Sequence, residues 1–231
     1  MTISRFFLAA LVVTCLLASC APDPSNPGAS FAFVKAKVGS TYTFDYFETD
    51  STGAVIPGSR DTIINTIAET GVAFEGRTDV SVVEGFWGSP DDTLWFACEA
   101  NNDVSLSLAI SSRKRAWAAM PINSNTPRTV DAADTMTESS VIRIERRIFT
   151  SSREGIDTIV IHGQSFPAVK TKLRVRTISI LDGTTTLDDE QDLYVNWVPS
   201  LGYMSRAYTA GQRDPIGARG RDQQLLDYHL N

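Results

Sequence analysis

The amino-acid sequence predicts an all-β protein built on an antiparallel sheet. Two observations support this prediction. β-branched and aromatic residues alternate with polar residues in short runs, as in Tyr42–Tyr46, and this period of two is typical of half-buried strands. Clusters of turn residues, such as Asp50–Gly53, separate the runs at intervals of about ten residues, as in all-β folds.

The N-terminal half of the chain shows this pattern repeatedly. The run at Tyr42–Tyr46, the turn at Asp50–Gly53 and a second run at Asp61–Ala68 form a predicted hairpin. The same reasoning predicts further strands at Val72–Val83, Thr93–Cys98 and Val104–Ile110.

The pattern is lost between Pro121 and Ser140, which is rich in Thr, Ser, Asn and Asp. A structureless stretch of this length is uncommon within one domain. We therefore interpret residues 121–140 as a long loop or a boundary, with room for a short helix around Asp131–Met136.

The C-terminal half returns to alternation. Its clearest strand, Val169–Thr177, has an apolar face and a basic face of Lys170, Lys172, Arg174 and Arg176. We interpret the basic face as a solvated sheet surface paired with acids across the strand; the alternative is contact with anionic headgroups or an acidic partner. Further strands are predicted at Val141–Phe149, Ile156–Ile161, Leu193–Val198 and Tyr203–Tyr208, with a strand or short helix at Leu225–Leu230.

The first nineteen residues have the layout of a secretory signal. Arg5 supplies a positive charge, and Phe6–Leu17 is an uncharged apolar run that is too short to span a bilayer, which needs about 20 residues. The run ends in Leu17-Ala18-Ser19-Cys20, which resembles the lipobox of bacterial lipoproteins.

The lipobox resemblance implies cleavage before Cys20 and acylation of that cysteine. Two or more acyl chains hold a protein stably on a membrane. Residues 20–30 are rich in Pro, Ser, Gly and Asn and predict a flexible tether, followed by one β-domain over residues 31–231. Ala21 favours the outer membrane, because Asp at this position retains lipoproteins in the inner membrane of the best-studied systems.

Composition excludes several function classes. Without Arg5 the mature chain has 20 basic and 27 acidic residues, a net charge of −7 instead of −6, which argues against a nucleic-acid partner. Cys98 is left without an intramolecular partner and lies in an apolar run, so we expect a buried free thiol. Two histidines and one free cysteine cannot form a closed zinc site, and no cofactor is expected.

The sequence gives no sign of catalysis. His162 and Ser165 lie close together, but the Gly-x-Ser-x-Gly elbow of hydrolases is missing. The acidic run of Asp188, Asp189, Glu190 and Asp192 lacks the spacing and central glycine of a calcium loop, and we interpret it as a solvated turn. We therefore expect a binding or structural protein and not an enzyme.

Aromatic residues are the remaining candidates for a binding surface. They could face an apolar ligand on the concave side of the sheet, or they could pack the core. The candidates are Tyr42, Phe44, Tyr46, Trp95, Trp197 and Tyr203.

Two stretches resemble uncharacterised envelope β-proteins of the Bacteroidetes and Chlorobi lineage. They are Lys37–Phe44, where Val-Gly precedes an aromatic-rich strand, and Gly163–Lys170 with the later Leu193–Tyr203. More distantly, the second stretch is similar to half-barrel proteins of the lipoprotein-localisation type. The resemblance implies a curved antiparallel sheet, forming a half-barrel or open barrel, and no known activity.

Two function classes follow from these features. The domain binds a lipid or other apolar molecule on the concave side of its sheet, or it is a scaffold that binds another envelope protein. A cavity of a few hundred cubic ångströms is the usual requirement for the first. A scaffold instead fills the concavity with its own side chains and presents a patch or sheet edge.

Replacing Cys20 tests the lipid anchor. We expect Cys20→Ser to move the protein from the membrane fraction to the soluble fraction, because serine has no thiol to form the thioether. Fractionation of cells that express the variant measures this, and unchanged membrane retention would rule out the anchor.

Overall fold

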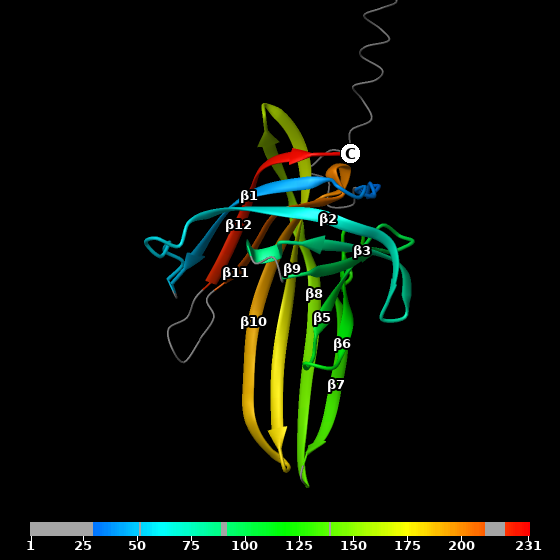
Figure 1. Ribbon diagram of the computed structural model, residues 1–231, viewed down its shortest axis with the longest axis vertical. Coiled ribbons are helices and arrows are strands. Elements are labelled where there is room, and N and C mark those ends of the chain that lie inside the picture. The colour runs from blue at the N-terminus through cyan, green and yellow to red at the C-terminus, as the bar shows by residue number, and fades with distance from the viewer. Residues whose placement is uncertain (1–29, 51, 89–91, 139, 211–219) are drawn as a thin grey trace, which may run out of the picture.

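The computed structural model describes residues 30–50, 52–88, 92–138, 140–210 and 220–231. It confirms the all-β prediction. Twelve antiparallel strands form one sheet that curves into a nearly closed barrel, in the order β6-β5-β4-β3-β2-β1-β12-β11-β10-β9-β8-β7 (Figure 1). The predicted signal peptide, Cys20 and most of the tether lie outside the described residues.

The strands vary greatly in length. Two short 3-10 turns, η2 (Phe86–Gly88) and η3 (Pro199–Leu201), accompany them. The first six strands are β1 (Thr41–Thr49), β2 (Asp61–Phe74), β3 (Arg77–Glu84), β4 (Leu94–Cys98), β5 (Val104–Ala109) and β6 (Arg115–Met120). The last six are β7 (Arg128–Glu138), β8 (Val141–Ile161), β9 (Gln164–Leu181), β10 (Thr184–Val198), β11 (Tyr203–Ala210) and β12 (Gly220–His229).

The two ends of the sheet, β6 and β7, meet at a seam. No backbone ladder joins them within the described residues. Side chains of β8 bridge the seam instead: the Ser151 hydroxyl donates to the carbonyl of Ala119, and Arg147 Nη1 donates to the carbonyl of Ala109 at 2.7 Å. The barrel is therefore closed by side chains and not by strand pairing.

Aromatic side chains fill the barrel. The rings of Tyr42 and Tyr203 lie 4.6 Å apart and are fully buried. Tyr42 donates its hydroxyl hydrogen to the carbonyl of Leu201 at 2.8 Å, and Asn65 Nδ2 donates to the Tyr203 hydroxyl at 3.1 Å. Each buried phenol thus has a polar partner.

The segment before β1 closes one end of the barrel. Phe33 packs edge-on against Trp197, with ring centroids 6.1 Å apart, and the backbone N–H of Val34 donates to the carbonyl of Pro199 at 2.8 Å. Gly202 is required at this contact: its φ is +67°, and a Cβ there would lie 2.2 Å from the carbonyl oxygen of Val34. We call this end of the barrel the plugged end.

Four strands continue past the other end of the barrel. β8 has 21 residues and β9 has 18, and at about 3.3 Å per residue β8 spans about 70 Å. Figure 1 shows β7 to β10 projecting as two long adjoining hairpins at the bottom of the view. We call the part of these strands beyond the core the extension.

The central region differs from the prediction. Asp131–Met136 is not a helix or a loop but part of β7, which pairs with β8 from Arg128↔Ser151 to Glu138↔Val141. β7 belongs to the same sheet as the strands before and after it in the sequence. The alternation is missing because β7 is an edge strand of the extension, where neither face meets a full core and polar residues protect the edge.

Candidate functional site

The predicted aromatic site turns out to be mainly core. Tyr42, Phe44, Trp197 and Tyr203 are fully buried and pack against one another or against neighbouring aromatics. Trp95 lies on the outer surface, stacked on Phe74 at 4.9 Å with Arg115 over its other side at 4.5 Å. Tyr46 is half-buried beside Trp87. Four of the six predicted residues therefore lie together in the structure, where they pack the core of the barrel.

The basic face of β9 is paired with acids, as the sequence analysis favoured. Arg176 Nε donates to Asp188 at 2.8 Å, Arg174 Nε to Asp192 at 2.9 Å, and Lys172 Nζ lies 2.9 Å from Asp192. The acidic run is thus not a turn but part of β10. Its register against β9 places Glu190 opposite Arg176 and Asp192 opposite Arg174, whereas Asp189 lies opposite Thr177.

These pairs affect the carboxylates. The hydrogen bond from Arg174 is the largest cause that holds the pKa of Asp192 below its ordinary value, and Lys172 adds to it. The outer face of the extension is therefore neutralised by its own partners, which removes it as a binding site for anions.

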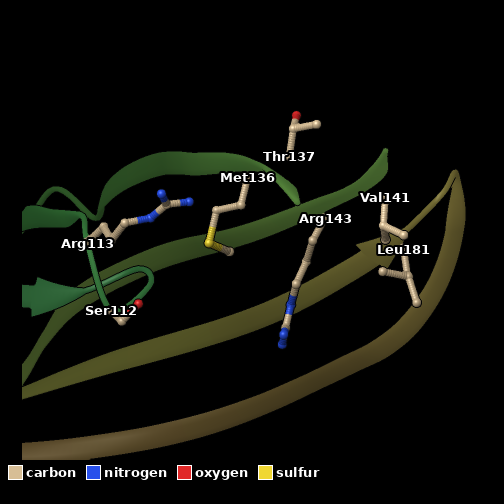
Figure 2. Close-up of a pocket in the computed structure, with 7 residues that line it drawn as sticks. All are labelled: Ser112, Arg113, Met136, Thr137, Val141, Arg143 and Leu181. Atoms are coloured by element: carbon tan, nitrogen blue, oxygen red, sulfur yellow. The ribbon is translucent and has the colours of Figure 1, made fainter. Parts of the chain in front are cut away.

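The inner face of the extension is different. Strand register aligns Met136 of β7, Arg143 of β8 and Leu181 of β9 in one row, so their side chains share a face. The β5–β6 loop at Ser112 and Arg113 lies opposite this row. Together they line a groove of about 770 Å³, which Figure 2 shows in close-up.

The groove combines apolar and cationic groups. Val141 and Leu181 are 39% and 41% exposed, although both are large apolar residues in paired strands. Arg143 Nε donates to Glu145 at 2.6 Å, whereas Arg113 makes no ion pair with any residue that the structure describes. In Figure 2, Met136 lies between the Ser112–Arg113 loop and the apolar side chains of Val141 and Leu181. The groove can therefore hold an apolar chain with a negative charge at its loop side.

Sequence reasoning missed this groove. Its residues come from the β5–β6 loop and three strands, and the polar composition of residues 121–140 concealed β7. The available signal was two apolar residues, Met136 and Val141, on either side of the short polar stretch 137–140. This signal is weak without the strand register.

The structure also shows the surroundings of His162 and Cys98. His162 Nε2 lies 2.9 Å from Asp227 Oδ1 and not against Ser165; it starts a two-residue turn with Gly163. Cys98 is a free thiol, but it is half-buried and not fully buried, and burial raises its pKa. In the described residues, no group of His, Cys, Asp or Glu is placed to hold a metal ion, and no helix is long and apolar enough to cross a membrane.

Comparison with known proteins finds solved structures that are similar to this chain. No protein-family model matches the chain, and no curated protein matches it. The hypothetical lipoprotein YmcC from Escherichia coli K12 is 14% identical, with 94% of this chain and 96% of that chain covered and a TM-score of 0.40. A putative exported protein with a YmcC-like fold from Bacteroides fragilis is 9% identical, with 87% and 100% covered and a TM-score of 0.39.

Acid titration tests the ion pairs of the extension. The folded-state pKa of Asp192 is lowered, so its stabilising effect is complete above the unfolded value of about 3.9 and is lost as the pH falls through the folded value. We expect Asp192→Asn to lower the free energy of unfolding by up to about 1 kcal/mol at pH 7, with the difference narrowing at pH values below about 4.

Urea unfolding of the complete mature chain carrying Cys20→Ser measures this difference at each pH. Asp157→Asn is the matched control, because Asp157 is an exposed strand residue that makes no ion pair with the described residues. A pH-independent loss in Asp192→Asn, or an equal loss in the control, would show that the ion pairs do not stabilise the extension.

Proposed function

We propose that this protein is an outer-membrane lipoprotein, anchored by Cys20, that binds another envelope protein through the groove of its extension. The observation that carries the proposal is the groove itself. Large apolar side chains remain exposed at its tip, at Val141 and Leu181, while the barrel interior is filled. Exposed apolar surface of this kind is typical of interaction sites.

The filled barrel favours a protein partner over an internal lipid cargo. The aromatics that could have faced a ligand, led by Tyr42, Trp197 and Tyr203, have essentially no exposed surface. A concavity filled by its own side chains is what a scaffold requires. The alternative ligand is an apolar molecule on the concave side of the sheet. It could then bind only at the end of the barrel or in the groove.

The geometry supports a partner that lies away from the anchoring membrane. The predicted tether ends at residue 30, where the segment that forms the plugged end begins, and eleven residues reach at most about 40 Å when fully extended. The hairpin tips lie at the opposite end of the molecule from the C-terminus, which adjoins the plugged end: the backbone N–H of Asn231 donates to the Ser40 hydroxyl at 3.2 Å (Figure 1). The extension therefore places the groove away from the membrane to which Cys20 would be anchored.

The chemistry of the groove indicates an extended segment with apolar and acidic side chains. Met136, Val141 and Leu181 supply apolar contacts, and Arg113 supplies a cation with no internal partner among the described residues. Arg113 is exposed to solvent, so we expect it to contribute mainly to the rate and selectivity of association.

Site-specific photo-crosslinking in cells tests the proposal. With p-benzoylphenylalanine at position 181, we expect a discrete covalent adduct with one envelope protein. The matched control is position 160, because Val160 is 65% exposed on a strand at the other end of the molecule. We expect no such adduct there, and Arg113→Glu should reduce the yield from position 181 severalfold.

Three outcomes would contradict the proposal. These are equal adducts from positions 181 and 160, no protein adduct from position 181, or an adduct of lipid mass only. The last would favour the apolar-molecule alternative. Fractionation of the same cells shows separately whether the anchor is intact.

A further inference from the structure

A second cavity opens at the end of the barrel opposite the plug. It has a volume of about 210 Å³. Three polar residues, Arg147, Gln191 and Thr209, border it. The rest of its wall is apolar and is formed by Trp87, Leu108, Ala109, Phe149, Leu173, Val175 and Leu193.

Arg147 is unusual among the arginines of this molecule. Its Nη1 donates to the carbonyl of Ala109, but its Nε is buried and has no hydrogen-bond partner. It makes no ion pair with any described residue. The nearest candidate, Glu145, is already engaged: one oxygen accepts from Arg143 at 2.6 Å and the other from Ser179 at 2.7 Å.

A comparison with Arg115 shows what Arg147 lacks. Arg115 also has no ion pair with the described residues, yet its Nε donates to Ser107 at 2.9 Å and its guanidinium stacks on Trp95. Burial lowers the pKa of both arginines. Arg147 is half-buried and presents an unused Nε donor to a largely apolar cavity. Glu145 attracts its charge but forms no ion pair with it, whereas charges taken out of water are normally paired.

The wall of the cavity is also strained. Trp87 has φ 60° and ψ 18°, the left-handed region that bulky side chains rarely adopt. Such strain persists where the surrounding structure holds it in place, and it is frequent at ligand-binding sites. Trp87 is held by its packing on Tyr46 and Phe86.

From these observations we propose that the cavity binds a short-chain anionic amphiphile. The alkyl chain lies among Phe149, Leu173 and Leu193, and the carboxylate or other anionic head accepts hydrogen bonds from Arg147. Cavities of about 150 Å³ hold a molecule the size of benzene, so this one suits a chain of moderate length and not a diacyl lipid. This site is separate from the groove and does not depend on the protein partner proposed above.

Calorimetric titration with three eight-carbon probes tests the site: octanoate, 1-octanol and octyltrimethylammonium. The protein is the complete mature chain with Cys20→Ser. We expect octanoate to bind at one site at least tenfold more tightly than 1-octanol, and the cation not to bind. Arg147→Gln should weaken octanoate binding ten- to a hundredfold, because hydrogen bonds to charged groups are among the strongest. It should leave 1-octanol binding within about twofold.

Arg146→Gln is the matched control, since Arg146 is the neighbouring residue on β8, faces the other side of the sheet and is paired with Asp131. We expect octanoate affinity within about twofold of wild type. Thermal unfolding without ligand adds a second readout: Arg147→Gln should lose no more stability than its one hydrogen bond to Ala109 at the seam contributes, because the half-buried charge that it removes has no ion pair among the described residues. Val175→Phe, which fills the cavity and keeps Arg147, should abolish binding of both octanoate and 1-octanol.

Equal wild-type affinities for octanoate and 1-octanol would overturn the proposal. So would an equal loss of octanoate binding in Arg146→Gln and Arg147→Gln, or full octanoate binding in Val175→Phe. A large loss of stability in Arg147→Gln would show that Arg147 serves mainly to bridge the seam, and that result would also overturn the proposal.

Discussion

The packing of Tyr42 against Tyr203 is the interaction on which the rest of this structure depends. These rings join β1 to β11 across the barrel, and their hydroxyls bond to η3 and β2 through Leu201 and Asn65. Burial raises the pKa of both phenols, so both remain protonated and neutral at physiological pH. Because this cluster occupies the interior, the barrel is a stabilising core, and binding surface must be sought at its ends and on the extension.

The extension is a sheet without a full core of its own, and it must be stabilised differently. Cross-strand pairs such as Arg176–Asp188 and Arg174–Asp192 run along its outer face. Each contributes on the order of 0.2–1 kcal/mol. Together with continuous backbone pairing between β8 and β9, they hold the hairpins in place while the inner face stays uncovered. The charged groups of the outer face are therefore paired with one another, and the inner face is available for contact with a partner.

Sequence reasoning succeeded where a strand has a core on one side and solvent on the other. The alternation of Val169–Thr177 matched the buried and exposed faces of β9 because Leu173 packs inward and Arg174 outward. It failed for β7, because period-two patterning needs a core that β7 largely lacks. The groove and the setting of Arg147 escaped prediction because both depend on residues brought together from distant strands. The aromatic candidates did mark important positions of the fold. Whether Trp197 faces a ligand or the core, and whether Trp95 faces outward, depends on how the barrel closes, and the sequence pattern does not show this.

Shortening the hairpins tests most directly whether the barrel is a core that folds without the extension. Ala133, Arg146, Ile178 and Asp188 lie in one register row, so Asn-Gly turns can replace residues 134–145 and 179–187 without changing the register below that row. We expect the shortened chain to unfold in one cooperative transition, with a free energy of unfolding within about 1–2 kcal/mol of the full chain. Loss of the cooperative transition in urea would contradict this account, because it would show that the barrel cannot fold without the extension.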